Sequence, residues 1–171
     1  MEACAECGYD YEGLSRAEIL AAAPDLAEEY RALLGSIPAD RLREHTRPGS
    51  WSALEYGCHV RDMLRVQRDR VLLAQAEDTP HFTPMRRDER AVEERYNEQD
   101  PPAVGAAIVA AAGGFTRTLA ALDDVGWRRT GIYNWPVTAI RTIEWIGQRT
   151  VHELAHHLFD CRRLLGSSQA G

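Results

Sequence analysis

Apolar residues recur at three- and four-residue intervals along four long stretches of this chain. Such spacing puts apolar side chains on one face of an α-helix, so it predicts helices at about residues 16–35, 53–76, 103–122 and 138–165. Residues 78–100 look irregular, with a short helix near 90–96, and residues 126–136 look like a loop. Convincing alternation typical of strands is missing. The pattern therefore predicts an all-α protein, a four-helix bundle.

Local signals set the ends of these helices. Ser15 with Glu18, and Ser52 with Glu55, each form the serine–glutamate pair of a capping box. Pro24 removes a backbone hydrogen bond inside the first helix, so we expect a break or restart there. Three parts result: a Cys-containing head at residues 1–14, the bundle at 15–166 and a flexible tail at 167–171.

Composition narrows the function classes. The net charge of −6 argues against a nucleic-acid binder, and all 20 basic residues are arginines, which excludes a lysine nucleophile. No apolar run approaches membrane-spanning length, and the N-terminus lacks the basic and apolar regions of a secretory signal. We therefore expect a cytoplasmic protein with no membrane partner.

The stretch TVHELAHHLFD, residues 150–160, holds the candidate chemistry. It contains two overlapping pairs at i, i+4 spacing. His152 and His156 bracket a glutamate in the HExxH pattern of zinc proteases, while Glu153 and His157 form a carboxylate–imidazole pair. Either pair can present two metal ligands from one helix face, so the choice depends on which face is buried.

The helical period favours the second pair. The apolar stripe of the last helix should face the core, and His157 lies roughly 75° from its centre and Glu153 roughly 115°. His152 and His156 lie about 145° and 175° away, toward solvent. Ligands inside a bundle must project inward. The stripe comprises Ile140, Ile143, Gly147, Val151, Leu154, Leu158, Cys161 and Leu165.

A third ligand is present on the second helix. His59 sits at the edge of an apolar face, and with Glu153 and His157 it completes a set of two nitrogens and one oxygen. Such a set leaves coordination positions for water or substrate. Asp62 and Glu55 lie one turn either side of His59, and we expect one of them to orient its second ring nitrogen.

The stretches GSWSALEYGCHVRDM and TVHELAHHLFD together resemble the DinB/YfiT-like superfamily, which includes mycothiol-dependent maleylpyruvate isomerases and bacillithiol transferases. The family has a Trp-Ser at the start of its second helix and a histidine eight residues after that tryptophan, which Trp51 and His59 match. Its metal-ligand pair ends three residues before a polar residue; counting back from Asp160 gives His157 and Glu153. A glutamate in the first of these positions resembles the mycothiol-dependent branch.

The resemblance implies an up-down-down-up bundle that holds Zn²⁺, Ni²⁺ or Fe²⁺, often as a homodimer. It also implies a thiol-dependent transferase or isomerase, in which a mycothiol-type thiol reacts with an electrophilic small molecule. Metal binding lowers the pKa of a thiol and holds the nucleophile in place, so this chemistry is physically sensible. The alternative is a non-enzymatic metal-binding or stress-response module that works through the N-terminal cysteines.

The remaining candidates are cysteines and arginines. Cys4 and Cys7 form a Cys-x-x-Cys-Gly pattern, half of a zinc knuckle. The pair is either without metal, or redox-active, or part of a structural zinc site if two further ligands converge on it. Cys58, Cys161 or the outward pair His152 and His156 could supply them. We expect Cys58 to point away from the apolar face and Cys161 to be buried and inert.

Arg128 and Arg129, in the loop of residues 126–136, are the preferred contacts for an anionic thiol cofactor or dicarboxylate. Trp127, Tyr133 and Trp135 could form the wall of the same pocket.

Overall fold

The computed structural model describes residues 4–10, 13–134 and 137–167. Its four long helices are α1 (Arg16–Ser36), α3 (Ala53–Ala76), α5 (Pro101–Ala120) and α7 (Ile143–Ser167). Short helices α2 (Ala39–Leu42), α4 (Arg87–Glu93), η1 (Tyr96–Glu98) and α6 (Asp124–Arg128) lie in the connections, with strands β1 (Thr130–Tyr133) and β2 (Ala139–Thr142). The tail expected from residue 167 falls beyond the described residues, apart from the last residue of α7.

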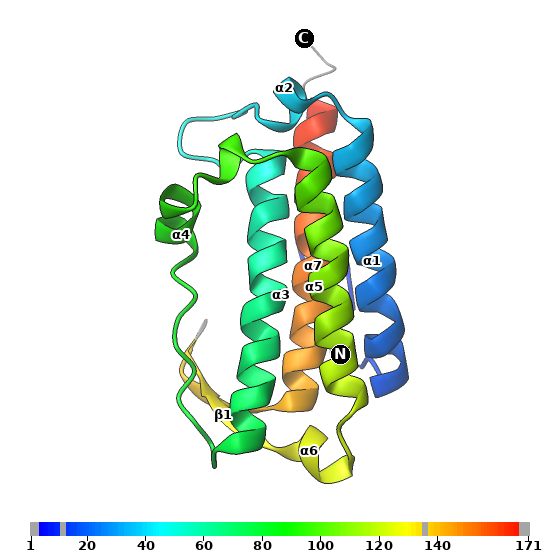
Figure 1. The fold of residues 1–171 in the computed structure, drawn as a ribbon, viewed down its shortest axis with the longest axis vertical. Helices are drawn as coiled ribbons and strands as arrows, with labels where there is room; N and C mark the ends of the chain where they lie inside the picture. Colours follow the sequence, from blue (N-terminus) through cyan, green and yellow to red (C-terminus); the bar gives the residue numbers. More distant parts are fainter. Residues whose placement is uncertain (1–3, 11–12, 135–136, 168–171) are drawn as a thin grey trace.

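The four long helices form the expected up-down-down-up bundle. In Figure 1, α1 and α7 run in one direction while α3 and α5 run in the other. Helix α5 packs on α1 and α3, and α7 packs on the same two helices from the other side. Each helix therefore has one antiparallel and one parallel neighbour, and α3 lies against α7, which brings the two predicted ligand-bearing helices together.

Both capping boxes are present. The Ser15 side chain accepts from the backbone N–H of Glu18, and the Ser52 side chain accepts from that of Glu55. The expected break at Pro24 is wrong, because α1 continues through it. Residues on either side of the proline stay in one buried stripe against α5 and α7, and this packing outweighs the lost hydrogen bond. That stripe is Ile19, Ala23, Ala27, Tyr30 and Leu34.

The connection between α5 and α7 differs from the sequence prediction. Residues 130–133 and 139–142 pair as a two-stranded antiparallel sheet, with Ile132 opposite Ile140. Helix α7 therefore starts at Ile143, later than expected, and Ile140 is 64% exposed instead of lying in the core stripe. Strands of four residues are too short to give a clear alternation in sequence.

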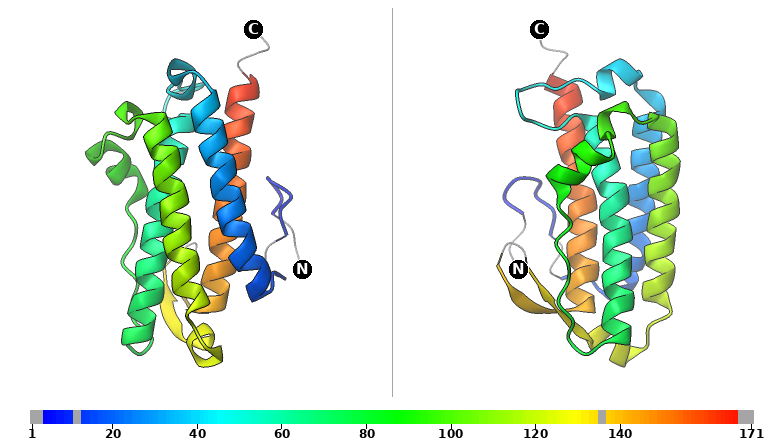
Figure 2. Two further views of the ribbon diagram at one scale, coloured as in Figure 1. Left: turned by 45° about the vertical axis from the view of Figure 1, so that its right-hand side comes forward. Right: turned by 60° about the vertical axis from the view of Figure 1, so that its left-hand side comes forward.

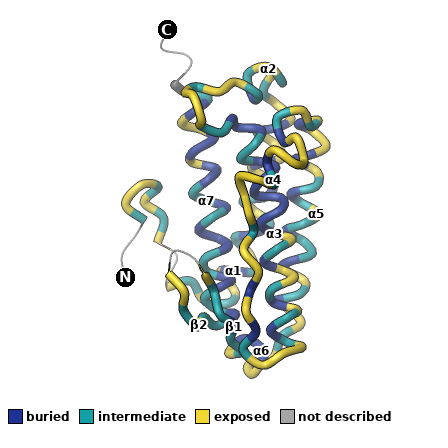
Figure 3. Tube along the Cα trace, turned by 90° about the vertical axis from the view of Figure 1, so that its left-hand side faces the viewer, coloured by how far each residue is buried: buried dark blue, intermediate teal, exposed yellow. Residues whose placement is uncertain are grey.

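Residues 77–86, which we call the strap, return along the outside of α3 and join the small sheet. Phe82 donates its backbone N–H to the carbonyl oxygen of Ile132, and Ile132 donates to that of Pro80. Figure 3 shows the strap as a largely exposed segment in front of buried α3. The strap and the sheet thus form a wall beside the bundle.

Helix α5 corrects the expectation that no apolar run approaches membrane-spanning length. Within the described part of the chain, it is the one helix long and apolar enough to cross a membrane by length and composition. Its small residues allow close approach: a Cβ on Gly105 would lie 3.1 Å from the Cα atom of Arg31 in α1. In this structure α5 packs as a helix of the bundle core, with Ile108, Ala112 and Phe115 fully buried.

Candidate metal centre

The structure brings His59, Glu153 and His157 together. His59 projects from α3, and the other two project from adjacent turns of α7. One ligand atom from each lies within 4.8 Å of the others. The rings of His59 and His157 have centroids 5.1 Å apart. We call these three residues the bundle centre.

The distances within α7 suit a shared metal ion. Nε2 of His157 lies 3.3 Å from a carboxylate oxygen of Glu153. Two ligands at typical zinc–nitrogen and zinc–oxygen distances, in tetrahedral arrangement, are about 3.4 Å apart. On the other side of the ring, Nδ1 of His157 lies 3.2 Å from the Asp160 carboxylate. Such a carboxylate fixes the orientation of a metal-ligating histidine.

His59 shows the clearest sign of a missing partner. It is 5% exposed, and its Nδ1 atom has no hydrogen-bond partner among the described residues. Burial and the nearby His157 lower the pKa of His59 to about 3, so its imidazole is neutral at physiological pH. A neutral buried imidazole beside a carboxylate and a second imidazole fits a divalent cation.

Glu153 is held as a carboxylate. Burial alone would raise its pKa, but the hydrogen bond from His157 and the charge of Arg149 outweigh this and lower it to about 2. Arg149, one turn earlier in α7, forms a salt bridge with Glu153. The oxygen ligand is therefore ionised across the physiological range, as metal binding requires.

The expected orienting role of Asp62 or Glu55 is wrong. Asp62 accepts hydrogen bonds from the buried guanidinium of Arg61 at 2.8 Å and from the hydroxyl of Tyr96 at 2.7 Å. Glu55 accepts from the backbone N–H at the start of α3. Both carboxylates are thus engaged in structural contacts, and aromatic rings flank the centre instead. Trp51 lies against His59 and Tyr56 against His157, each at 5.1 Å between centroids.

A cavity of about 380 Å³ opens beside the bundle centre, and His59 and Glu153 line its wall. The opposite wall comes from the strap, from α4, from Tyr133 at the end of β1 and from the adjoining Asn134. The cavity wall is rich in guanidinium groups, and two carboxylates besides Glu153 also line it. The arginines are Arg70, Arg86, Arg87 and Arg149, and the carboxylates are Asp88 and Glu89.

Several cavity residues are fixed by contacts with one another. Gln67 donates to the hydroxyl of Tyr133 at 3.0 Å, and the guanidinium of Arg70 lies 4.7 Å from the centre of the Tyr133 ring. Arg70 also donates to the Thr83 carbonyl oxygen of the strap at 2.8 Å. Sequence patterns missed Arg70 and Arg149, because no spacing rule connects α3, the strap and α7 before the fold is known. Asp160 was used only as the residue from which the ligand pair is counted back, and its contact with His157 was not predicted.

Arg128 and Arg129 lie elsewhere. Both border a separate hollow near Asp78 and Thr130, and neither lines the cavity beside His59. Arg129 donates to the carbonyl oxygens of Ala74 and Glu77 at the end of α3. Trp127 is buried, Tyr133 does line the cavity, and Trp135 lies outside the described residues.

The burial of the cysteines and of the outer histidines agrees only in part with the sequence prediction. Cys161 is fully buried as expected, but so is Cys58, beside the Tyr96 carbonyl oxygen, and burial raises its pKa to about 12. His152, expected to face solvent, is 5% exposed, because residues 4–10 lie over this side of α7 and bring Cys4 and Cys7 close to its ring. Helical periodicity could not predict this burial, because it describes only the helix itself and not the segments that pack on it.

Comparison with known proteins agrees with this geometry. A family model of the DinB superfamily matches residues 25–159. The chain belongs to the DinB superfamily. Its fold is similar to that of Bacillus subtilis YfiT, described as a probable metal-dependent hydrolase with an unusual four-helix bundle topology. The TM-score is 0.78 at 19% identity, over 92% of this chain and 93% of YfiT.

A second similar structure is a mycothiol-dependent maleylpyruvate isomerase. It matches with a TM-score of 0.66 at 17% identity, over 88% of this chain and 63% of the isomerase. No curated protein matches the sequence significantly. At these identities the two structures establish a shared fold, and the chemistry of this DinB-superfamily protein has to be argued from its own residues.

Proposed function

We propose that this chain is a divalent-metal-dependent enzyme in which His59, Glu153 and His157 hold the metal. One observation carries the proposal: ligand atoms of the three residues lie within 4.8 Å of one another, and two of the residues line the wall of the cavity. A set of three protein ligands leaves positions for substrate, whereas a structural site is closed by four.

The reaction we favour is the addition or transfer of a low-molecular-weight thiol to an electrophile. A bound Zn²⁺, Ni²⁺ or Fe²⁺ would lower the pKa of a thiol and hold the nucleophile beside the cavity. Glu153 in the first ligand position of α7 and the fold shared with a mycothiol-dependent isomerase support a thiol of the mycothiol type. Hydrolysis is the competing reaction, since YfiT is described as a probable hydrolase.

The protein's own groups would bind and orient the reactants. Asp160 holds the His157 ring through Nδ1, which directs Nε2 toward Glu153 and the metal position. The guanidinium groups of the cavity wall would bind a carboxylate on the electrophile, because arginine forms paired hydrogen bonds with carboxylates. Arg149, which pairs with Glu153, would lie closest to the reacting atoms.

Two measurements test the proposal together. Protein purified without added metal should contain a divalent ion that is lost in His59→Ala and retained in His81→Ala, an exposed histidine of the strap. The metal-loaded protein should then convert carboxylate-bearing electrophiles only when a thiol such as mycothiol is present. Turnover of ester or amide substrates without thiol would favour a hydrolase. Metal binding without any turnover would favour a non-enzymatic metal-binding module.

A further inference from the structure

The loop Cys4–Asp10 lies along the outer side of α7, next to the helical turns that carry the histidines (Figure 2). It contains no helix or strand, and it is closed by two backbone hydrogen bonds. Cys4 donates to the Tyr9 carbonyl oxygen at 3.1 Å, and Gly8 donates to that of Cys4 at 2.8 Å. Gly8 has a φ of 72°, a left-handed conformation that glycine adopts without strain.

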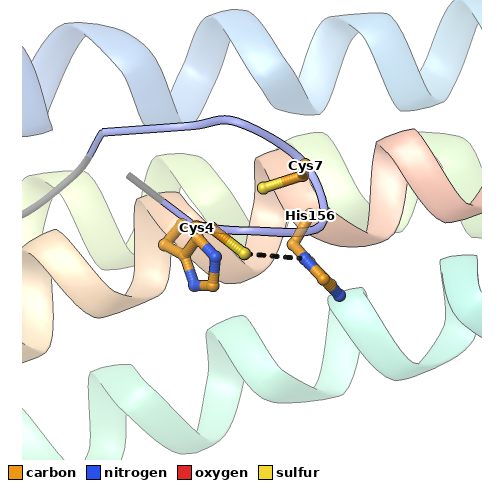
Figure 4. Close-up of side chains that lie close together, drawn as sticks. Cys4, Cys7 and His156 are labelled. Atoms are coloured by element: carbon orange, nitrogen blue, oxygen red, sulfur yellow. Dashed lines mark hydrogen bonds between the residues drawn. The ribbon is translucent and has the colours of Figure 1, made fainter. Parts of the chain in front are cut away.

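This loop points its two thiols at α7. The backbone N–H groups of Cys7 and Glu6 donate to the Cys4 sulfur. The four cysteines of the chain all lie within the described residues and form no disulfide. Figure 4 shows Cys4, Cys7 and His156 gathered where the loop crosses the helix.

Four potential ligands meet at this point. One ligand atom from each of Cys4, Cys7, His152 and His156 lies within 4.8 Å of the other three. The Cys4 sulfur lies 3.7 Å from Nδ1 of His156. In a tetrahedral zinc site, typical zinc–sulfur and zinc–nitrogen lengths place such a pair about 3.6 Å apart. The ligand types and their spacing, Cys-x-x-Cys with two histidines at i, i+4 on a helix, are those of a closed structural zinc site.

We propose that Cys4, Cys7, His152 and His156 hold a structural zinc ion that fastens the N-terminal loop to α7. We call these four residues the loop site. The loop exposes Ala5, Glu6, Gly8 and Asp10 and brings little apolar surface to the bundle, with Tyr9 as its one partly buried ring. A segment of this kind needs a cross-link or a metal to stay in one place.

The second nitrogen of His156 is oriented as a zinc ligand requires. Its Nε2 lies 3.4 Å from Glu6 and 3.6 Å from Asp160. A carboxylate on the far nitrogen fixes the ring and its tautomer when the near nitrogen binds metal. His156 therefore has a sulfur on one side and acids on the other.

The loop site is separate from the bundle centre and does not depend on the proposed enzymatic function. Two pairs of α7 residues, offset by one position, belong to the two different sites. His152 and His156 face the loop, and Glu153 and His157 face α3. Successive helix residues differ by about 100° in direction, so two i, i+4 pairs offset by one residue form two adjacent ligand faces. The HExxH pattern in this chain is thus divided between the two sites.

Metal content and cobalt spectra test the proposal. Protein from cells grown with added zinc should bind two zinc equivalents per chain, and one of them should be lost in Cys4→Ser/Cys7→Ser. Among the bands of cobalt-substituted protein, the thiolate-to-cobalt charge-transfer bands should disappear in the double variant. His59→Ala should keep these bands and lose the other metal ion. Tyr9→Phe, in the same loop, is the matched control and should behave like wild type.

Two results would overturn the proposal. One is a double variant with unchanged metal content and cobalt spectrum. The other is wild-type protein in which Cys4 and Cys7 form a disulfide or react with a thiol reagent at the same rate with and without zinc. The second measurement uses wild-type protein, so it decides the matter even if the double variant folds poorly.

Discussion

The Asp160 carboxylate lies 3.2 Å from Nδ1 of His157, one helical turn earlier in α7. The same oxygen lies 3.6 Å from Nε2 of His156. Asp160 therefore orients one histidine of the bundle centre and one of the loop site.

Asp160→Asn should lower metal affinity at the bundle centre by about 10- to 100-fold, the usual cost of removing a carboxylate that orients a ligating histidine. Chelator competition on a Cys4→Ser/Cys7→Ser background measures this without the loop cysteines. Glu29→Asn, which removes an exposed acid paired with Arg162, is the control and should leave affinity unchanged. Unaltered affinity in the Asp160 variant would show that His157 does not need this partner.

Metal binding at the bundle centre should release a proton from His157. Burial lowers the pKa of His157, but hydrogen bonds to Asp160 and Glu153 outweigh it and raise the pKa above its usual value. The metal-free imidazole is thus protonated at about pH 6, and release should approach one proton there and fall as pH rises. His59 is already neutral and contributes none. Calorimetry in buffers of different ionisation enthalpy measures the number of protons released on metal binding. Release of no proton at pH 6 would contradict this assignment.

Asp62→Asn should destabilise the fold by about 3 kcal/mol, because it leaves the Arg61 guanidinium buried beside a neutral amide. Arg61 is 7% exposed and Asp62 is 2% exposed. Denaturant unfolding measures the change. Asp69→Asn, an exposed acid on the same helix, is the control and should stay within about 0.5 kcal/mol of wild type.

The Asp62 effect should also depend on pH. Burial raises the pKa of Asp62, but hydrogen bonds from Arg61 and Tyr96 outweigh it, so the folded-state pKa lies below the ordinary value. Its contribution is therefore present above the unfolded pKa of about 3.9 and is lost as pH falls below it. The stability difference between wild type and Asp62→Asn should shrink in that acidic range. A difference that grows on acidification would reverse the sign and contradict the assignment.

Gly131→Ala should disturb the cavity wall, because a Cβ at this position in β1 would overlap the ring of buried Phe82 in the strap. We expect a loss of about 2–3 kcal/mol from overpacking, with metal content at the bundle centre unchanged. Gly35→Ala near the end of α1, where a Cβ meets nothing within 4 Å, should cause no loss. Equal stability of the two variants would show that the strap is not packed on β1.

The sequence was most informative where a long periodic signal or a local motif was available. The capping boxes at Ser15 and Ser52, the four long helices and the inward direction of Glu153 and His157 all followed from helical geometry. The expected break at Pro24 failed because tertiary packing outweighs one lost backbone bond.

The remaining features depend on contacts between segments far apart in the chain. The small sheet is stabilised by the strap, where His81 forms a bridge with Ile132 and Phe82 donates its backbone N–H to the Ile132 carbonyl oxygen. The burial of His152 depends on residues 4–10, which form neither helix nor strand, and the position of Arg129 depends on the carbonyl oxygens at the end of α3. No periodicity in one segment can encode these long-range pairings.

Anomalous diffraction at the absorption edge of the bound metal tests the central claim most directly. Crystals of the metal-loaded protein should show a peak about 2.0–2.2 Å from ligand atoms of His59, Glu153 and His157 together, the range of zinc–nitrogen and zinc–oxygen distances. A fully loaded protein without a peak between α3 and α7 would contradict the account.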